Sequence, residues 1–136
     1  MIKVNLSNFA IFILRATLGV IFLVHGLQKL FGVFGGSGIE GFTQMLAGLN
    51  FAPANFWAWL VAIIEALGGL FLIFGILPRL ISALIAVIMI VAITKIHAAN
   101  GFLAAQGGFE YQLLILTVCI LFILTGGGKF SLLNKW

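Results

Sequence analysis

The residues whose side chains could form a functional site lie along a polar stripe in an otherwise apolar segment. Residues 11–31 read IFILRATLGVIFLVHGLQKLF, which is as apolar as a membrane span, yet they include Arg15, His25 and Lys29. On an α-helix these three side chains fall on one broad face. A charge at mid-bilayer costs about 2.5–3.5 kcal/mol, whereas each Leu or Ile returns only about 0.3–0.6 kcal/mol. The stripe therefore needs partners from other segments, and those partners would define a site.

Glu65 is the first candidate partner, and we predict that it forms a buried ion pair with Arg15. At about 1.5 Å per residue, Arg15 lies about 9 Å from one membrane side and Glu65 about 13 Å from the other. In a core of about 30 Å their depths differ by about 8 Å, which an arginine side chain can bridge. Gly19, Gly68 and Gly69 would let the two backbones approach. Such a pair fits either a structural lock on helix register or a charged binding or proton-handling site.

A larger group of ionisable side chains forms the predicted binding pocket. These candidates are His25, Lys29, Glu65, Lys95, His97 and Glu110. Antiparallel packing of four helices would gather the outer members of this group above an apolar floor of Leu18, Phe22 and Leu72. Two histidines and a glutamate resemble a metal triad, but no HxxxH or ExxH spacing occurs and the nearby lysines would repel a cation. We therefore expect no metal but an anion or polar head group, with residues merely at the headgroup boundary as the alternative.

The composition indicates the class of protein that must position these residues. Of 136 residues, 63% are hydrophobic and only 7% are charged, against about 25% charged in soluble domains. The chain is therefore expected to be a single all-α domain, residues 1–136, in a lipid bilayer. The net charge of +4 arises from scattered residues without a basic run, which argues against nucleic acid as a partner. Cys119 is the single cysteine, so an internal disulfide is excluded.

Hydropathy and helix-breaking residues predict a membrane four-helix bundle. The four transmembrane helices are expected at about residues 9–31, 57–76, 80–97 and 110–125. A glycine-rich stretch, 32–38, ends the first span. Residues 39–49 have apolar side chains at helical spacing but are too few to cross a bilayer, which predicts a short amphipathic interfacial helix between spans one and two.

The basic residues near the span ends predict the orientation. One side has Lys3, Arg79, Lys129 and Lys135, and the other has Lys29 and Lys95. Cytoplasmic loops carry the excess of Lys and Arg, so the first side is expected to be cytoplasmic. Both termini would then be cytoplasmic.

Several of these features together resemble the DoxX family of small four-helix membrane proteins. The matching pieces are RATLG at 15–19, HGLQKL at 25–30, EALGG at 65–69, Gly75 with Arg79, His97 followed by Gly101-Phe102, Glu110, and the glycine-rich turn before the tail. The resemblance implies a four-span bundle in a bacterial or archaeal cytoplasmic membrane. It also implies redox association, because some members of the family resemble subunits of thiosulfate:quinone oxidoreductases.

The resemblance favours a quinone-linked membrane subunit over a catalyst that acts alone. A bound quinone would meet His25 or His97 at a carbonyl oxygen, and Glu65 or Glu110 would handle protons. The expected partners are a membrane or periplasmic redox protein and a second copy of the chain. The alternative is a non-enzymatic module that binds or carries a lipid or small anion, or that assists assembly. No autonomous catalytic motif is present, so whether the chain is itself an enzyme stays open.

Overall fold

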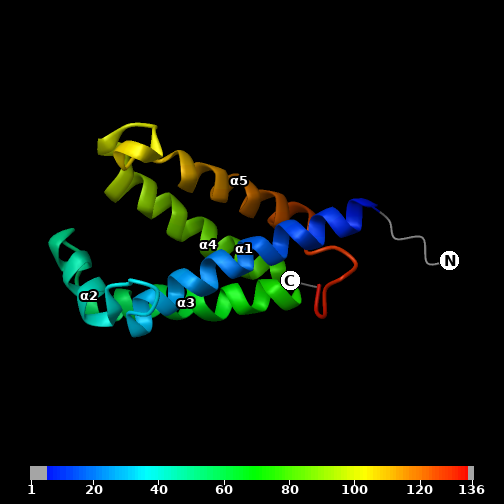
Figure 1. Cartoon of the computed structure of the whole chain (residues 1–136), viewed down its shortest axis with the longest axis horizontal. Helices are drawn as coiled ribbons and strands as arrows, with labels where there is room; N and C mark the ends of the chain where they lie inside the picture. Colours follow the sequence, from blue (N-terminus) through cyan, green and yellow to red (C-terminus); the bar gives the residue numbers. More distant parts are fainter. Residues whose placement is uncertain (1–5, 135–136) are drawn as a thin grey trace.

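The long helices run in two antiparallel pairs along the longest axis of the molecule (Figure 1). The computed structural model describes residues 6–134, and the five α-helices in this range are α1 (Leu6–Phe31), α2 (Gly38–Gly48), α3 (Ala54–Phe74), α4 (Pro78–Ala92) and α5 (Glu110–Thr125). α4 continues into a π-helical turn, Ile93–His97, and a 3-10 turn, Ala98–Asn100. Another 3-10 turn, Ala104–Gln106, lies before α5. α1 packs mainly on α3, and α4 packs mainly on α5.

Glycines set the close contact between α1 and α3. A Cβ atom on Gly19 would lie 2.6 Å from the carbonyl oxygen of Gly69, and one on Gly26 would lie 2.5 Å from Cα of Ala66. Side chains larger than hydrogen would separate the two backbones at these positions. The predicted approach at Gly19 and Gly69 is confirmed. Gly68 instead faces α4, where a Cβ would lie 3.1 Å from the side chain of Ile81.

A single apolar core joins the two helix pairs. Its buried members come from α1, α3, α4 and α5: Leu18, Phe22, Leu72, Ile81, Ile85, Ala86, Met89, Ile115, Cys119 and Phe122. Three of them, Leu18, Phe22 and Leu72, were expected to form the floor of a pocket. They are instead packed among side chains of the other helices, so this part of the molecule is a filled core.

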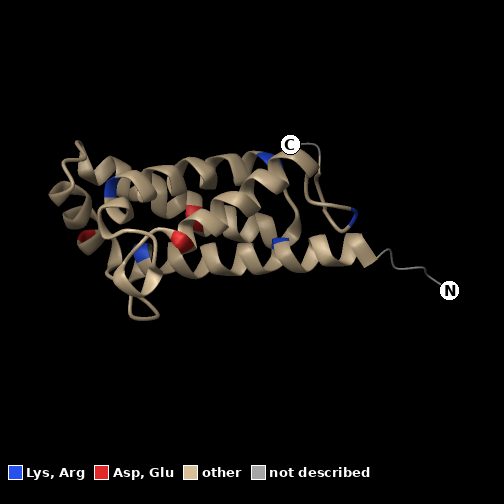
Figure 2. Cartoon of the chain, turned by 90° about the horizontal axis from the view of Figure 1, so that it is seen from above, with Lys and Arg blue, Asp and Glu red and all other residues tan. Residues whose placement is uncertain are grey.

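The helix lengths support part of the predicted span pattern. Three helical segments are long and apolar enough to cross a membrane: Leu6–Phe31, Ala54–Phe74 and Pro78–Asn100. α5 is apolar but has only 16 residues. Figure 2 shows few charged residues, separated by long uncharged stretches of helix. The chain is therefore an all-helical membrane protein.

The predicted amphipathic segment is a helix, α2. Its buried side chains, Phe42 and Leu46, pack on Ala58 at the start of α3. Glu40 and Gln44 are exposed. This division into an apolar and a polar face is the one expected for a helix that lies along a surface.

The chain after α5 folds back onto the turn between α3 and α4. Leu77 N donates to the carbonyl oxygen of Leu133 at 3.0 Å, and Leu133 N donates to that of Gly75 at 3.0 Å. Asn134 accepts a hydrogen bond from Gly127 N at 2.7 Å through its side chain. Residues 126–134, here called the C-terminal segment, therefore cover this end of the helices. Lys3 and Lys135, which contributed to the predicted orientation, lie outside the described residues.

Candidate functional site

Arg15 is fully buried and bonded to oxygen atoms of α3 and the C-terminal segment. Its Nε donates to the carbonyl oxygen of Leu72 at 2.8 Å. Nη1 donates to the Gly127 carbonyl and, at 2.7 Å, to Ser131 Oγ. Nη2 donates to the carbonyl oxygen of Phe130 at 2.7 Å. The guanidinium thus holds three chain segments together with its own donors.

The predicted ion pair between Arg15 and Glu65 is wrong. The glycine contacts between α1 and α3 set the register of the two helices. In this register Arg15 lies beside Leu72, which follows Glu65 along α3. The seven residues from Glu65 to Leu72 correspond to about 10 Å of helix. Estimates of depth alone could not detect this offset, because they placed each residue from a separate, assumed membrane boundary.

Glu65 pairs with Lys29. The distance from Lys29 Nζ to Glu65 Oε2 is 2.6 Å, and the side chains are 21% and 4% exposed, respectively. Lys29 Nζ also lies 5.3 Å from the ring centroid of Phe42, on α2. Within residues 6–134 this is the one ion pair between side chains. The pair joins α1 to α3, and the contact of Lys29 with Phe42 adds α2 at the same place. An ionisable pair among apolar helices, with one partner partly exposed, is a candidate for function.

His25 lies one helical turn before Lys29 on α1, which places the two side chains on neighbouring parts of one face. Its ring is half-buried and lies 6.4 Å from the Phe22 ring, centroid to centroid. Within residues 6–134 neither ring nitrogen of His25 makes a hydrogen bond to the protein. His25 is therefore the candidate whose donor and acceptor remain available to a ligand.

His97 belongs to a different cluster, at the end of the α4–α5 hairpin. Its Nδ1 lies 2.8 Å from the carbonyl oxygen of Gly107, and its Nε2 lies 3.1 Å from Nε2 of Gln112. A carbonyl oxygen only accepts, so Nδ1 carries the proton and Nε2 of the neutral ring accepts from Gln112. Both ring nitrogens are thus already bonded within the protein.

Glu110 and Lys95 also lie on the α4–α5 hairpin. Glu110 Oε1 accepts a hydrogen bond from Ala104 N at 2.8 Å. Lys95 is exposed and has no ion-pair partner within residues 6–134. The structure thus brings together His25, Lys29 and Glu65, and it places the other three candidates on the second helix pair, with no hydrogen bond or ion pair between the two groups in the described range.

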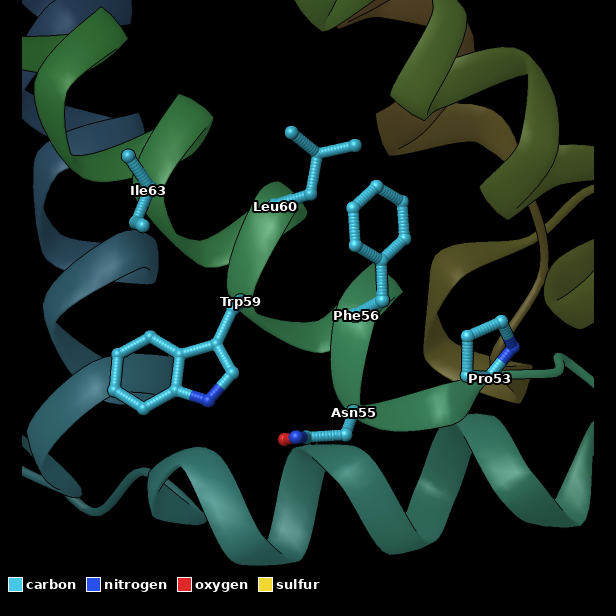
Figure 3. Close-up of a pocket in the computed structure, with 6 residues that line it drawn as sticks. All are labelled: Pro53, Asn55, Phe56, Trp59, Leu60 and Ile63. Carbon is cyan, nitrogen blue, oxygen red and sulfur yellow. The ribbon is translucent and has the colours of Figure 1, made fainter.

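An apolar groove runs along the first turns of α3, close in sequence to Glu65. It has a volume of about 510 Å³ and is lined by Pro53, Asn55, Phe56, Trp59, Leu60 and Ile63. Figure 3 shows Phe56 and Leu60 projecting from one side of α3 and Trp59 from another. The sequence did not predict this groove, because residue spacing alone does not show which face of a helix remains uncovered.

Two features of the site had no clear signal in the sequence. Phe42 lies beside Lys29 because α2 folds back on α3, and the carbonyl partners of Arg15 depend on the path of the C-terminal segment. In the part of the chain described, no three His, Cys, Asp or Glu side chains are grouped as a metal site would require. The arrangement offers a buried acid–base pair and an unbonded imidazole.

Comparison with known proteins identifies the family of this chain and two relatives. The model of the DoxX family matches residues 10–98. A Bacillus subtilis (strain 168) protein named "Putative oxidoreductase CatD" is 33% identical over 114 residues, which are 84% of this chain and 77% of the relative. A Haemophilus influenzae protein described as uncharacterized is 30% identical over 127 residues, 93% of this chain and 82% of the relative. No solved structure matches the chain.

Proposed function

Because the chain belongs to the DoxX family, we propose that it is a quinone-linked membrane subunit that works with an oxidoreductase partner. The observation that carries this proposal is the pair of Lys29 and Glu65, buried between helices α1 and α3 with the unbonded His25 one turn away. The name of the Bacillus subtilis relative, which calls it an oxidoreductase, agrees with a redox role.

The residues suit the head group of a quinone. Reduction of a quinone to a quinol takes two electrons from the partner enzyme and two protons, so titratable groups beside an apolar surface have a use. His25 can hydrogen-bond a carbonyl oxygen. The exposed part of Lys29 can pass a proton while Glu65 holds the ammonium in place at 2.6 Å.

The membrane arrangement belongs to the same proposal. α5 is assigned as the fourth span, and α2 is assigned to the interface. Arg79 and Lys129 lie at the end of the helices where α4 begins and α5 ends, and this end is assigned to the cytoplasm. Both termini are then cytoplasmic, in a bacterial or archaeal cytoplasmic membrane.

The test is to identify what copurifies with the full chain. The protein is purified in mild detergent, and quinone per protein is measured by mass spectrometry of an organic extract. We expect near-stoichiometric quinone, a clear loss in His25→Ala, and no loss in the matched control His97→Ala, since His97 is bonded within the protein. Absence of quinone from the wild type, or equal quinone in both variants, contradicts the proposal.

The groove on α3 favours a second candidate, a non-enzymatic lipid-binding module. A volume of about 510 Å³ lined mostly by apolar side chains can take part of an acyl chain. A stoichiometric phospholipid in the same extract, with no quinone, would support this candidate. Binding of a small anion is less favoured, because the Arg15 guanidinium is buried and bonded to protein oxygen atoms and the Lys29 ammonium is paired with Glu65. Lys95, which is exposed and has no ion-pair partner within residues 6–134, is the cation that remains for an anion.

A further inference from the structure

The connection between α4 and α5 is a loop in which several backbone groups are hydrogen-bonded to one another. Phe109 N donates to Gly101 O at 3.1 Å, and Glu110 N donates to Phe102 O at 2.9 Å. Gly108 N donates to Leu103 O at 2.8 Å. These bonds close residues 98–109, here called the α4–α5 loop, into a compact unit, which Figure 1 shows in yellow at the end of the hairpin.

Side chains add to the internal bonding of the α4–α5 loop. His97 Nδ1 and Asn100 Nδ2 both donate to the Gly107 carbonyl oxygen, at 2.8 and 3.3 Å. The carboxylate of Glu110 accepts from Ala104 N at 2.8 Å. Irregular backbone near membrane depth needs such partners from the protein, because lipid offers none.

The exposed surface of the α4–α5 loop is mostly apolar, with Asn100 and Gln106 as its exposed polar side chains. Phe102 is 52% exposed and Leu103 is 51% exposed, and the exposed Ala104 and Ala105 follow them. No charged residue occurs between Lys95 and Glu110. The Phe102 ring packs edge-on against Phe109 at 5.5 Å between centroids, so that about half of this side chain and of Leu103 stays open to the surroundings.

Helix lengths place the α4–α5 loop beside the end of α4 rather than beyond it. At the other end of the hairpin, Arg79 Nη1 donates to the carbonyl oxygens of Ile123 and Leu124, so α4 begins where α5 ends. From there, α4 has 15 residues and its π-helical continuation another 5 before the α4–α5 loop begins, whereas α5 has 16 residues. The difference of four residues corresponds to about 6 Å, and the length of α5, about 24 Å, is below the roughly 30 Å of a hydrocarbon core.

We propose that the α4–α5 loop is inserted in the bilayer, with Phe102 and Leu103 at the boundary between the lipid headgroups and the acyl chains. The loop supplies the depth that α5 lacks, and its internal hydrogen bonds reduce the cost of taking its backbone out of water. The partner of this surface is lipid. The inference rests on the proposal that α5 crosses the membrane.

The test measures the depth of single labelled cysteines in the full chain, reconstituted alone in phosphatidylcholine vesicles. In a Cys119→Ala background, Leu103→Cys and Phe102→Cys carry the polarity-sensitive fluorophore NBD, and Glu40→Cys is the matched exposed control on α2. We expect blue-shifted emission at 102 and 103, quenched by lipids with a nitroxide near the headgroup and protected from aqueous iodide. The label at 40 should show the opposite behaviour.

Emission and iodide quenching at 102 and 103 equal to those at 40 would overturn the inference, and a protein partner would then be the occupant to seek. A second measurement separates this result from a failure of the proposed topology. Lys129→Cys and Glu40→Cys should react with a membrane-impermeant maleimide from opposite sides of the vesicle if α5 crosses. Reaction from the same side would show that α5 does not cross the membrane, and both the fourth span and the inserted loop would be wrong. Reaction from opposite sides together with a water-exposed loop would show that only the insertion of the loop is wrong.

Discussion

The two cations on the buried stripe of α1, Arg15 and Lys29, are neutralised in different ways. Arg15 is fully buried, and its hydrogen-bond acceptors within residues 6–134 are carbonyl and hydroxyl oxygens, with no carboxylate among them. Lys29 is partly exposed and pairs with the buried Glu65. A planar guanidinium has five donors in a fixed geometry and can join several backbone segments, whereas an ammonium is a compact charge that exchanges its proton more readily.

This difference separates a structural position from a candidate chemical one. Every partner of Arg15 is a fixed part of the fold, and its contacts close the end of the helices where the C-terminal segment folds back. Lys29 and Glu65 are a titratable pair with the unbonded His25 nearby. Sequence alone grouped the two cations because they share a helix face, and the predictions below test the distinction.

The largest effect is expected from Arg15→Met. The change removes the donor to the buried carbonyl oxygen of Gly127 and to the partly buried Phe130 carbonyl and Ser131 hydroxyl. The Leu72 carbonyl loses one of its two donors and keeps Gly75 N. We expect the free energy of unfolding to fall by about 3–5 kcal/mol. Unfolding by SDS in mixed micelles measures this, with Arg79→Met as the control, because Arg79 is exposed and should contribute only about 0–1 kcal/mol.

A double variant tests whether Arg15 interacts with Glu65. The structure predicts that Arg15→Met with Glu65→Leu is no more stable than expected from the sum of the single changes, since the two side chains have different partners. Recovery of stability in the double variant would mean that the two charges are coupled after all.

The next effect is expected from Lys29→Met, which leaves the buried carboxyl group of Glu65 without its partner. The expected loss is about 2–3 kcal/mol, below the usual cost for a fully buried pair because Lys29 is partly exposed. Lys29→Met with Glu65→Leu should regain most of the loss in the same unfolding assay. A double variant as unstable as the two single variants together would rule out the pair.

Gly26→Ala tests the helix register that keeps Arg15 and Glu65 apart. The added Cβ would lie 2.5 Å from Cα of Ala66, so α1 and α3 must separate. We expect a loss of about 1–3 kcal/mol in the free energy of unfolding. Gly48→Ala is the matched control: nothing lies within 4 Å of its Cβ position, so it should be neutral or slightly stabilising. Equal effects at both glycines would contradict the close contact.

The smallest effect is expected from Gln112→Leu, on the second helix pair. The change removes the donor to His97 but also removes Gln112 Oε1, which is buried without a hydrogen-bond partner in the described range. These two terms oppose each other, and the net change should stay within about 1 kcal/mol. A loss as large as that of Lys29→Met would show that the α4–α5 cluster is as important for stability as the pair on α1 and α3.

The candidate site could be predicted in its residue types but not in its pairings. His25, Lys29 and Glu65 stand out because an ionisable residue in an apolar span needs a reason to be there. The predicted partner of Glu65 was wrong, because Arg15 and Lys29 lie on the same helix face and the sequence does not specify the register of α3 along α1. His97 and Glu110 were placed in the same pocket for a similar reason, although they bond within their own hairpin.

By itself, the sequence determined the class of the protein: apolar segments of membrane length force a helical backbone, because lipid offers no hydrogen-bond partners, and polar residues among them must find partners in the protein. It also determined the amphipathic helix α2 and the presence of small residues that let α1 and α3 approach, which depend on local spacing and side-chain size. Only the tertiary structure decided the register between α1 and α3. That register results from packing along whole helix faces, and a shift of two turns, about 11 Å, exchanges one charged partner for another.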